Sequence, residues 1–157
     1  MLGLAHQVEE GIRAALKAGR TEELSALRLI KAELSYRRVE LKVQNVADLD
    51  DPTVVEVLRS MIKKREKAIE LFEQGARRDL ADKERVEIKI IQTLLPKEIP
   101  EEELRALARQ VIDELGAQGP RDMGKVMGAL KGQPGVNPAA ASRVVKELLA
   151  ASGGQKP

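Results

Sequence analysis

The chain has 157 residues, of which 43% are hydrophobic and 33% charged, and its net charge is +2. A chain of this length forms one domain or two small ones, and many charged residues with few β-branched runs indicate an all-α fold. The absence of cysteine excludes disulfides and thiol chemistry, and the one apolar run to consider, Ile88–Leu95, is too short and too interrupted to span a membrane.

The first two helices are predicted from apolar residues at helical spacing and from their end signals. Gly19 stops the first helix, and Thr21 caps the second, which is expected to run to about Gln44. The residues expected to be buried are Leu4, Val8, Ile12, Ala15 and Leu16 in the first helix, and Leu24, Leu27, Ile30, Leu34 and Leu41 in the second.

A third and a fourth helix follow. The Asp51-Pro52 pair combines a helix cap with a proline at the first helical position, so the third helix is predicted to begin there and to end at Gly75. The fourth runs from about Arg77 to Leu95. The residues expected to be buried are Val55, Leu58, Ile62, Ile69 and Phe72 in the third helix, and Leu80, Ile88, Ile91 and Leu95 in the fourth.

Residues 96–100 begin and end with proline, and neither proline fits inside a helix without cost. We therefore expect this segment to link an N-terminal four-helix domain, residues 1–95, to a three-helix domain, residues 101–151. Residues 152–157 are expected to form a disordered tail.

Three shorter helices are predicted in the second domain. Gly116 stops the fifth helix, the sixth runs from near Pro120 to about Lys131, and Asn137-Pro138 caps the seventh. Their expected buried residues are Leu104, Leu107, Val111 and Leu115, then Met123, Val126, Met127 and Leu130, and finally Ala141, Val144, Val145 and Leu148.

Few residues in the chain are suited to catalysis. His6 is the single histidine and is expected to be an exposed residue of the first helix rather than a base or a ligand. No spacing of histidine and cysteine fits zinc, the serines have no histidine to act as base, and no phosphate-binding loop follows a strand. We therefore predict no catalytic residue, no metal site and no cofactor.

Several charged clusters have a structural explanation. Asp48, Asp50 and Asp51 resemble a carboxylate cluster, but a turn before a capped helix accounts for them without a metal. For Arg37-Arg38, surface charge and contact with a polyanion both stay open. The basic residues of the third helix alternate with glutamates and are predicted to form a solvated face with pairs four residues apart; they are Arg59, Lys63, Lys64, Arg65 and Lys67.

The glycine-rich stretch from 121 to 138 is the strongest candidate for a binding site. Gly124 and Gly128 stand one turn apart in the sixth helix, and together they cost about 2 kcal/mol relative to alanine. On a helical wheel Lys131 falls beside them, whereas Lys125 is expected to point to the opposite side. Either a phosphate backbone approaches this ridge or the glycines allow tight packing between the sixth and seventh helices.

The last third of the chain carries a local positive field that its net charge conceals, and both explanations of the glycines stay open. Lys97 to Asp122 holds four basic and seven acidic residues, whereas Met123 to Pro157 holds five basic residues and Glu147 as the single acidic one. The start of the seventh helix at Asn137 is expected to supply free N–H donors. Arg143 and Lys146 are expected to project from the outer face of that helix.

Three sequence segments carry a resemblance to a known family. DMGKVMGALKG followed by NP and an apolar helix, LLP before the acidic EEEL, and GIRAALKAGR before LSALRLIKAEL together resemble the GatB/YqeY family. The chain is similar to small stand-alone YqeY-like proteins over about Leu4 to Ala150. Its C-terminal third is similar to the GatB tail domain of the aspartyl/glutamyl-tRNA amidotransferase.

This resemblance implies a helical fold in two parts and a tail that helps to hold tRNA, while glutamine hydrolysis and transamidation belong to domains that this chain lacks. It implies RNA contacts at Gly124, Lys125, Gly128, Lys131, Gly132 and Asn137, and the charge pattern adds Arg143 and Lys146. Relatives have a longer basic connection after the sixth helix. Here GQPGV takes its place and supplies no charge for phosphate.

We therefore expect a non-catalytic tRNA-binding or tRNA-amidotransferase-related accessory protein. Its N-terminus lacks a secretory signal, so the expected location is cytoplasmic, without membrane contact. Amidotransferase or aminoacyl-tRNA synthetase components are further expected partners. Two alternatives stay open: carbon–nitrogen ligase activity with glutamine as amido-N-donor within a tRNA amidotransferase system, and a helical protein-interaction module.

Overall fold

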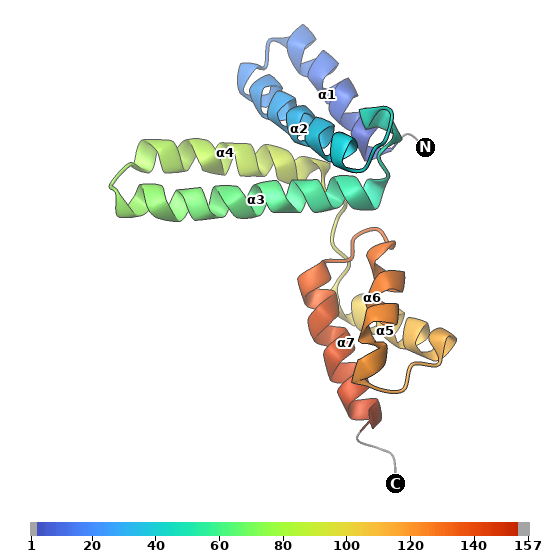
Figure 1. Ribbon diagram of the computed structural model, residues 1–157. Helices are drawn as coiled ribbons and strands as arrows, with labels where there is room; N and C mark the ends of the chain where they lie inside the picture. The colour runs from blue at the N-terminus through green and yellow to red at the C-terminus, as the bar shows by residue number, and fades with distance from the viewer. Residues whose placement is uncertain (1–2, 154–157) are drawn as a thin grey trace. The chain divides into compact units, whose positions relative to one another are not determined.

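The structure is a computed structural model that describes residues 3–153, and all of its regular elements in this range are helical. The predicted all-α class is therefore confirmed. The α-helices, labelled in Figure 1, are α1 (Leu4–Ala18), α2 (Thr21–Glu40), α3 (Asp51–Gln74), α4 (Arg78–Leu94), α5 (Glu101–Leu115), α6 (Met123–Lys131) and α7 (Pro138–Gly153). Short 3-10 helices precede α3 and α6, at Val46–Asp48 and Pro120–Asp122.

The chain divides into two compact units, which we call the N-terminal unit (Met1–Leu95) and the C-terminal unit (Pro96–Pro157). Among the described residues, none of the helices combines the length with the apolar composition that a membrane span needs. Of the expected disordered tail at 152–157, Ser152 and Gly153 belong to α7, and residues 154–157 lie outside the described range.

The N-terminal unit consists of two helical hairpins, because α1 packs along α2 and α3 packs along α4 (Figure 1). Its core forms where the hairpins meet, and its fully buried large residues are Val8, Ile30, Leu34, Val54, Leu58 and Ile91. Val54 and Val57, which the apolar spacing did not select, are buried, whereas the predicted Ile62, Ile69 and Phe72 are only half-buried. The distal half of the α3–α4 hairpin therefore has a thinner core.

An ion-pair cluster lies inside this distal hairpin. Arg65 Nε is 3.3 Å from Glu87 and 3.9 Å from Glu84, and all three side chains are at most 22% exposed. The prediction of a solvated face with pairs along α3 is wrong for Arg65, because its partners lie across the hairpin on α4. Neighbouring Lys63 and Lys64 are exposed, as expected.

The second helix ends earlier than predicted. Lys42 adopts a left-handed φ of 58°, and the N–H of Val43 donates to the carbonyl of Arg38, which closes α2 at Glu40. The Arg38 guanidinium also donates to the carbonyls of Val43 and Gln44, at 3.2 Å each. Since the chain turns here, Leu41 is 50% exposed, and the expectation that it is buried in the core is wrong.

Each aspartate at or just before the start of α3 has its own backbone or side-chain partner. The carboxylate of Asp50 accepts from the Thr53 N–H and caps α3. Hydrogen bonding with the Thr53 side chain, and then with the Thr53 N–H, holds the pKa of Asp50 below its usual range. Asp51, the predicted cap, instead accepts from the Leu4 N–H at the start of α1. Asn45 donates to Asp48. The expectation that a turn and a helix cap account for these carboxylates is confirmed, but the capping residue is Asp50 instead of Asp51.

Other helix ends agree more closely with the sequence. Gly19 and Gly116 take left-handed φ values of 70° and 64° at the ends of α1 and α5, as predicted. Thr21 is the first residue of α2 and makes no capping bond, so its predicted role is wrong. Leu16 and Leu115 are 60% and 47% exposed rather than buried, because each lies in the last turn of its helix.

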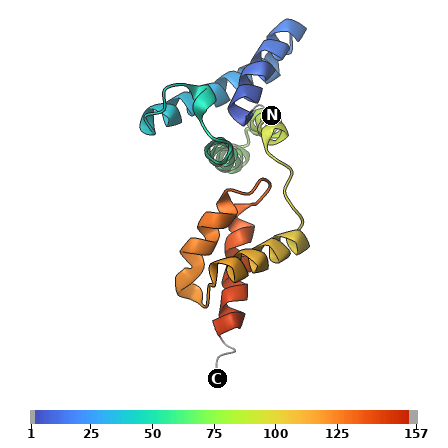
Figure 2. The same ribbon diagram turned by 90° about the vertical axis from the view of Figure 1, so that its right-hand side faces the viewer.

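In the C-terminal unit α5, α6 and α7 pack against one another, with α5 running across the other two (Figure 2). The fully buried large residues are Val126, Leu130, Val144, Val145 and Leu149. Leu148, the expected last residue of the α7 stripe, is half-buried, and Leu149 takes the core position.

Candidate nucleic-acid interface

The core fixes which side of α6 faces outward. Val126 and Leu130 are completely buried, and Met123 and Met127 pack beside them. The carboxylate of Asp122 accepts from the Gln118 N–H at 2.9 Å, which holds the turn before α6 and keeps the pKa of this carboxyl below its usual range. The opposite side of the helix is therefore presented to solvent in one defined orientation.

That outward side carries three glycines with open space beyond them. A Cβ atom at Gly124, Gly128 or Gly132 would meet no atom within 4 Å apart from the helix itself and the adjoining residues. Tight packing against α7, one of the two explanations of these glycines, is therefore wrong. The cost of Gly124 and Gly128 in helix stability is not offset by any contact that a side chain would make within the described part of the chain.

Two lysines flank this side. At 100° per residue, Lys125 and Lys131 lie roughly 60° to either side of Gly128, so the expectation that Lys125 points away from the glycines is wrong. Both are exposed and form no ion pair with any described residue. We call Gly124, Lys125, Gly128, Lys131 and Gly132 the glycine face.

Both polar atoms of the Asn137 side chain form hydrogen bonds at the start of α7. Its Oδ1 accepts from the N–H groups of Ala139 and Ala140, and its Nδ2 donates to Glu98 at 3.0 Å. Pro138 has no N–H, and the N–H of Ala141 already donates to the Asn137 carbonyl. The expectation of free N–H donors for phosphate at this helix start is therefore wrong.

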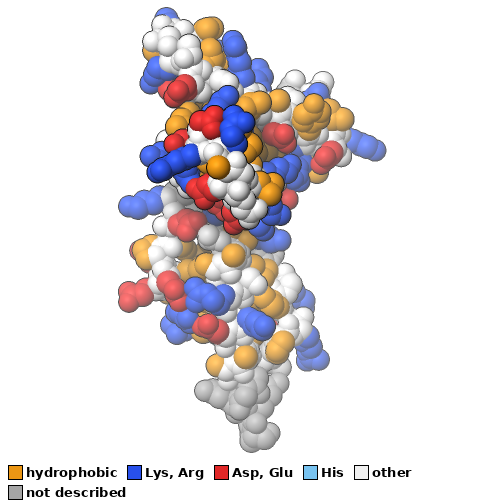
Figure 3. Space-filling view, turned by 90° about the vertical axis from the view of Figure 1, so that its left-hand side faces the viewer, with side chains coloured by type: hydrophobic (Ala, Val, Ile, Leu, Met, Phe, Trp, Pro, Cys, Tyr) orange, Lys and Arg blue, Asp and Glu red, His pale blue; other side chains and the backbone are white. Residues whose placement is uncertain are grey.

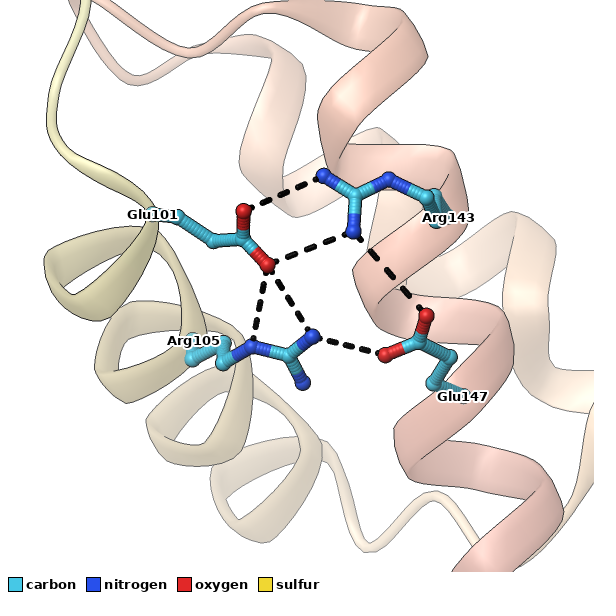
Figure 4. Close-up of polar contacts among 4 residues, drawn as sticks. All are labelled: Glu101, Arg105, Arg143 and Glu147. Carbon is cyan, nitrogen blue, oxygen red and sulfur yellow. Dashed lines mark hydrogen bonds and ion pairs between the residues drawn. The ribbon is translucent and has the colours of Figure 1, made fainter.

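Arg143 belongs to a cluster of four charged residues that connects α5 with α7 (Figure 4). Its guanidinium donates to both carboxylate oxygens of Glu101, at 3.2 and 3.3 Å, while Arg105 donates to Glu101 at 3.1 Å and to Glu147 at 2.7 Å. These bonds keep the pKa of Glu101 low and raise that of Arg143. Arg143 is therefore a structural residue rather than a free phosphate contact.

Lys146 differs from Arg143 although both are exposed on α7. It lies about 100° around the helix from Glu147, on the flank turned away from α5. No described residue forms an ion pair with it. Of the two cations predicted on α7, Lys146 is the one that forms no ion pair within the described chain.

The loop after α6 has a structural role. Gly135 has a left-handed φ of 80°, and a Cβ there would lie 2.5 Å from the Lys97 carbonyl oxygen. The Ile99 N–H donates to the Gly135 carbonyl at 3.0 Å. Residues 97–99, part of the segment expected to be a linker, therefore belong to the C-terminal unit, and the GQPGV loop is shaped to receive them.

The N-terminal unit uses its other candidate residues internally. Arg37 pairs with Glu40 and Glu56, and Arg38 donates to two backbone carbonyls, so both arginines have partners within the chain, as the surface-charge alternative expects. His6 lies 3.5 Å from Glu10 and is half-buried. On the face drawn in Figure 3, basic and acidic side chains are interspersed.

The family match covers nearly the whole chain. Residues 5–149 match the family described as Yqey-like protein. The chain is also 35% identical over 83 residues to the uncharacterized protein C22F3.15 of Schizosaccharomyces pombe, an alignment that covers 53% of this chain and 64% of that protein. This chain thus spans just under two thirds of that relative's length. Because the family match includes both units, the chain belongs to the family of Yqey-like proteins.

Proposed function

We propose that this protein is a cytoplasmic, non-catalytic tRNA-binding accessory protein that binds through its glycine face. The observation that carries the proposal is the open space beyond Gly124, Gly128 and Gly132, between two exposed lysines that form no ion pair within the described chain. The resemblance of the C-terminal third to an amidotransferase tail domain, which helps to hold tRNA, supports the same assignment.

The chemistry of this surface fits a phosphate backbone. Glycines let a sugar-phosphate chain come close to α6, because no side chain stands in its way. Lys125 and Lys131 then act as point charges on either side, and Lys146 adds a third cation from the free flank of α7. With two or three phosphates neutralised, the logarithm of the binding constant should fall with the logarithm of salt concentration with a slope of about −2 to −3.

The decisive experiment compares two charge-reversed variants. Lys125→Glu/Lys131→Glu should abolish salt-dependent binding of total tRNA, measured by filter binding or anisotropy. The matched control is Lys83→Glu/Lys89→Glu on α4, where two exposed lysines have the same spacing and no ion pair within the described chain. The control variant should bind like the wild type. Equal binding by both variants would exclude the glycine face as the site.

A second pair of variants separates binding from folding. Gly128→Ala should raise stability by up to about 1 kcal/mol, because its Cβ enters open space in the interior of a helix. Gly128→Leu should keep the fold but weaken tRNA binding by roughly tenfold, since the larger side chain keeps the backbone away. Unchanged tRNA binding by Gly128→Leu, with a salt-insensitive partner protein lost instead, would favour the protein-interaction module.

A further inference from the structure

Helix α2 has apolar residues on two opposite sides. Its inner side carries Leu27, Ile30 and Leu34, which are at most 3% exposed in the core. The outer side carries Leu29, Tyr36 and Val39, which are 44%, 69% and 62% exposed. With the exposed Ala32 they follow a spacing of three, four and three residues and fall within roughly 80° of the helix circumference. We call these four residues the outer stripe.

A helix that is apolar on both sides normally packs on both sides. The outer stripe extends over three turns and holds three of the large exposed hydrophobic residues of the described chain. By contrast, Leu16, Leu71 and Leu115 are exposed singly, each on a different helix. Scattered single leucines need no partner, whereas a continuous stripe indicates an interface.

We propose that the outer stripe pairs with the outer stripe of a second copy of this chain, in parallel orientation. The spacing is that of a heptad repeat, with Leu29 and Tyr36 at a positions and Ala32 and Val39 at d positions. Arg28 then occupies a g position, and Glu33 the following e position. Parallel pairing places each Arg28 beside Glu33 of the second copy, which is five residues further along.

The charges on the two flanks favour this occupant and this orientation. Arg28 and Glu33 form no ion pair within the described chain, whereas the nearby Lys31 and Arg37 are paired with Glu9 and with Glu40 and Glu56. In antiparallel pairing e positions face e positions, so Glu33 would meet the acidic e residues of the second copy. Parallel pairing brings together opposite charges instead. The stripe covers fewer than three heptads, so the dimer should be weak and concentration-dependent.

Disulfide trapping tests the proposal directly, because the chain contains no cysteine. Parallel in-register pairing places Val39 next to Val39 of the second copy, so Val39→Cys should form a disulfide-linked dimer under mild oxidation. Leu71→Cys on α3, which is 67% exposed in the unmodified chain, is the control and should stay largely monomeric. A Leu29→Cys and Val39→Cys mixture that crosslinks only between the two variants would show antiparallel pairing and overturn the proposal.

Sedimentation equilibrium of the full chain provides the second test. Tyr36→Lys should abolish the concentration-dependent dimer while the helical circular-dichroism spectrum is retained, because the side chain does not contribute to the core. Arg28→Glu should raise the dissociation constant roughly tenfold, and Arg28→Glu/Glu33→Arg should restore it. A wild-type chain that stays monomeric at every accessible concentration, or a charge swap without restoration, would refute the parallel dimer.

Discussion

Ala76 and Lys42 end their helices in the left-handed region without being glycine, with φ values of 56° and 58°. At the end of α3 the N–H of Arg77 donates to the Phe72 carbonyl at 2.7 Å, which fixes Ala76 in this conformation. The glycine beside it, Gly75, has an ordinary φ of −86° and does not need its freedom. The sequence predicts that α3 ends at Gly75, but the residue that takes the left-handed conformation at this helix end is Ala76.

Exchanging these two residues should therefore stabilise the protein. Gly75→Ala/Ala76→Gly removes the left-handed alanine, and the new Cβ at position 75 meets its nearest atom at an ordinary 3.6 Å. We expect a gain of about 1–2 kcal/mol in the free energy of unfolding, measured with urea. The opposite control is Gly116→Ala, where φ is +64° and a loss of about 1 kcal/mol is expected. A loss on exchange at 75 and 76 would show that the Ala76 methyl group matters more than backbone strain.

At the scale of elements, α5 and α7 are joined by charge as well as by their apolar faces. Glu101 stands at the first position of α5, where a carboxylate also favours the helix dipole, and it accepts hydrogen bonds from Arg143 and Arg105. The guanidinium of Arg143, and then that of Arg105, holds the pKa of Glu101 below its ordinary value. Both contacts are stronger when the Glu101 carboxylate is ionised, because hydrogen bonds between charged groups are stronger than neutral ones.

The pH dependence follows from the sign of this shift. Because the folded pKa lies below the unfolded one, the contribution of Glu101 is complete above the unfolded pKa and is lost as pH falls through the folded pKa. Glu101→Gln should therefore lower the protection of α5 and α7 amides in hydrogen exchange at pH 7 and leave them less sensitive to acid. If wild type and variant lose protection in parallel as the pH falls below the ordinary pKa of a glutamate, about 4.3, Glu101 is not the titrating group.

At the scale of the whole molecule, the two units have separate hydrophobic cores. One extends from Leu4 to Ile91 with Leu94 and Leu95 at its edge, and the other extends from Ile99 to Leu149. Leu58 and Leu130 are both completely buried, one in each core. Each core therefore contains the interactions that stabilise its own helices.

Truncating one core should leave the other folded. Leu130→Ala should cost about 2–5 kcal/mol and open the C-terminal unit, with loss of tRNA binding, while the amides of α3 stay protected in hydrogen exchange mass spectrometry. Leu58→Ala is the matched change in the N-terminal unit and should have the converse pattern of protection. Simultaneous loss of protection in both units, from either substitution, would contradict independent cores.

The local signals of the sequence were sufficient for the helices and many of their ends. Helical spacing and the glycines at 19 and 116 predicted α1 and α5, and the Asn137-Pro138 pair predicted the cap of α7. These features depend on backbone hydrogen bonds between residues close in sequence. The all-α class and the buried face of α6 at Val126 and Leu130 could be predicted because apolar residues recur at helical spacing.

Tertiary structure alone decided which charged and small residues are available. Arg65, Asp51 and Arg143 have partners 19 to 47 residues away, so no local pattern reveals that they are engaged. The glycines also differ in ways that only the structure shows. A Cβ at position 135 would clash with the carbonyl oxygen of Lys97, whereas Gly124 and Gly128 face open space. The sequence by itself determined where α6 lies and that its glycines are costly. Only the packing of distant elements decided that no other element covers these glycines, because a residue's neighbours depend on how the helices pack together.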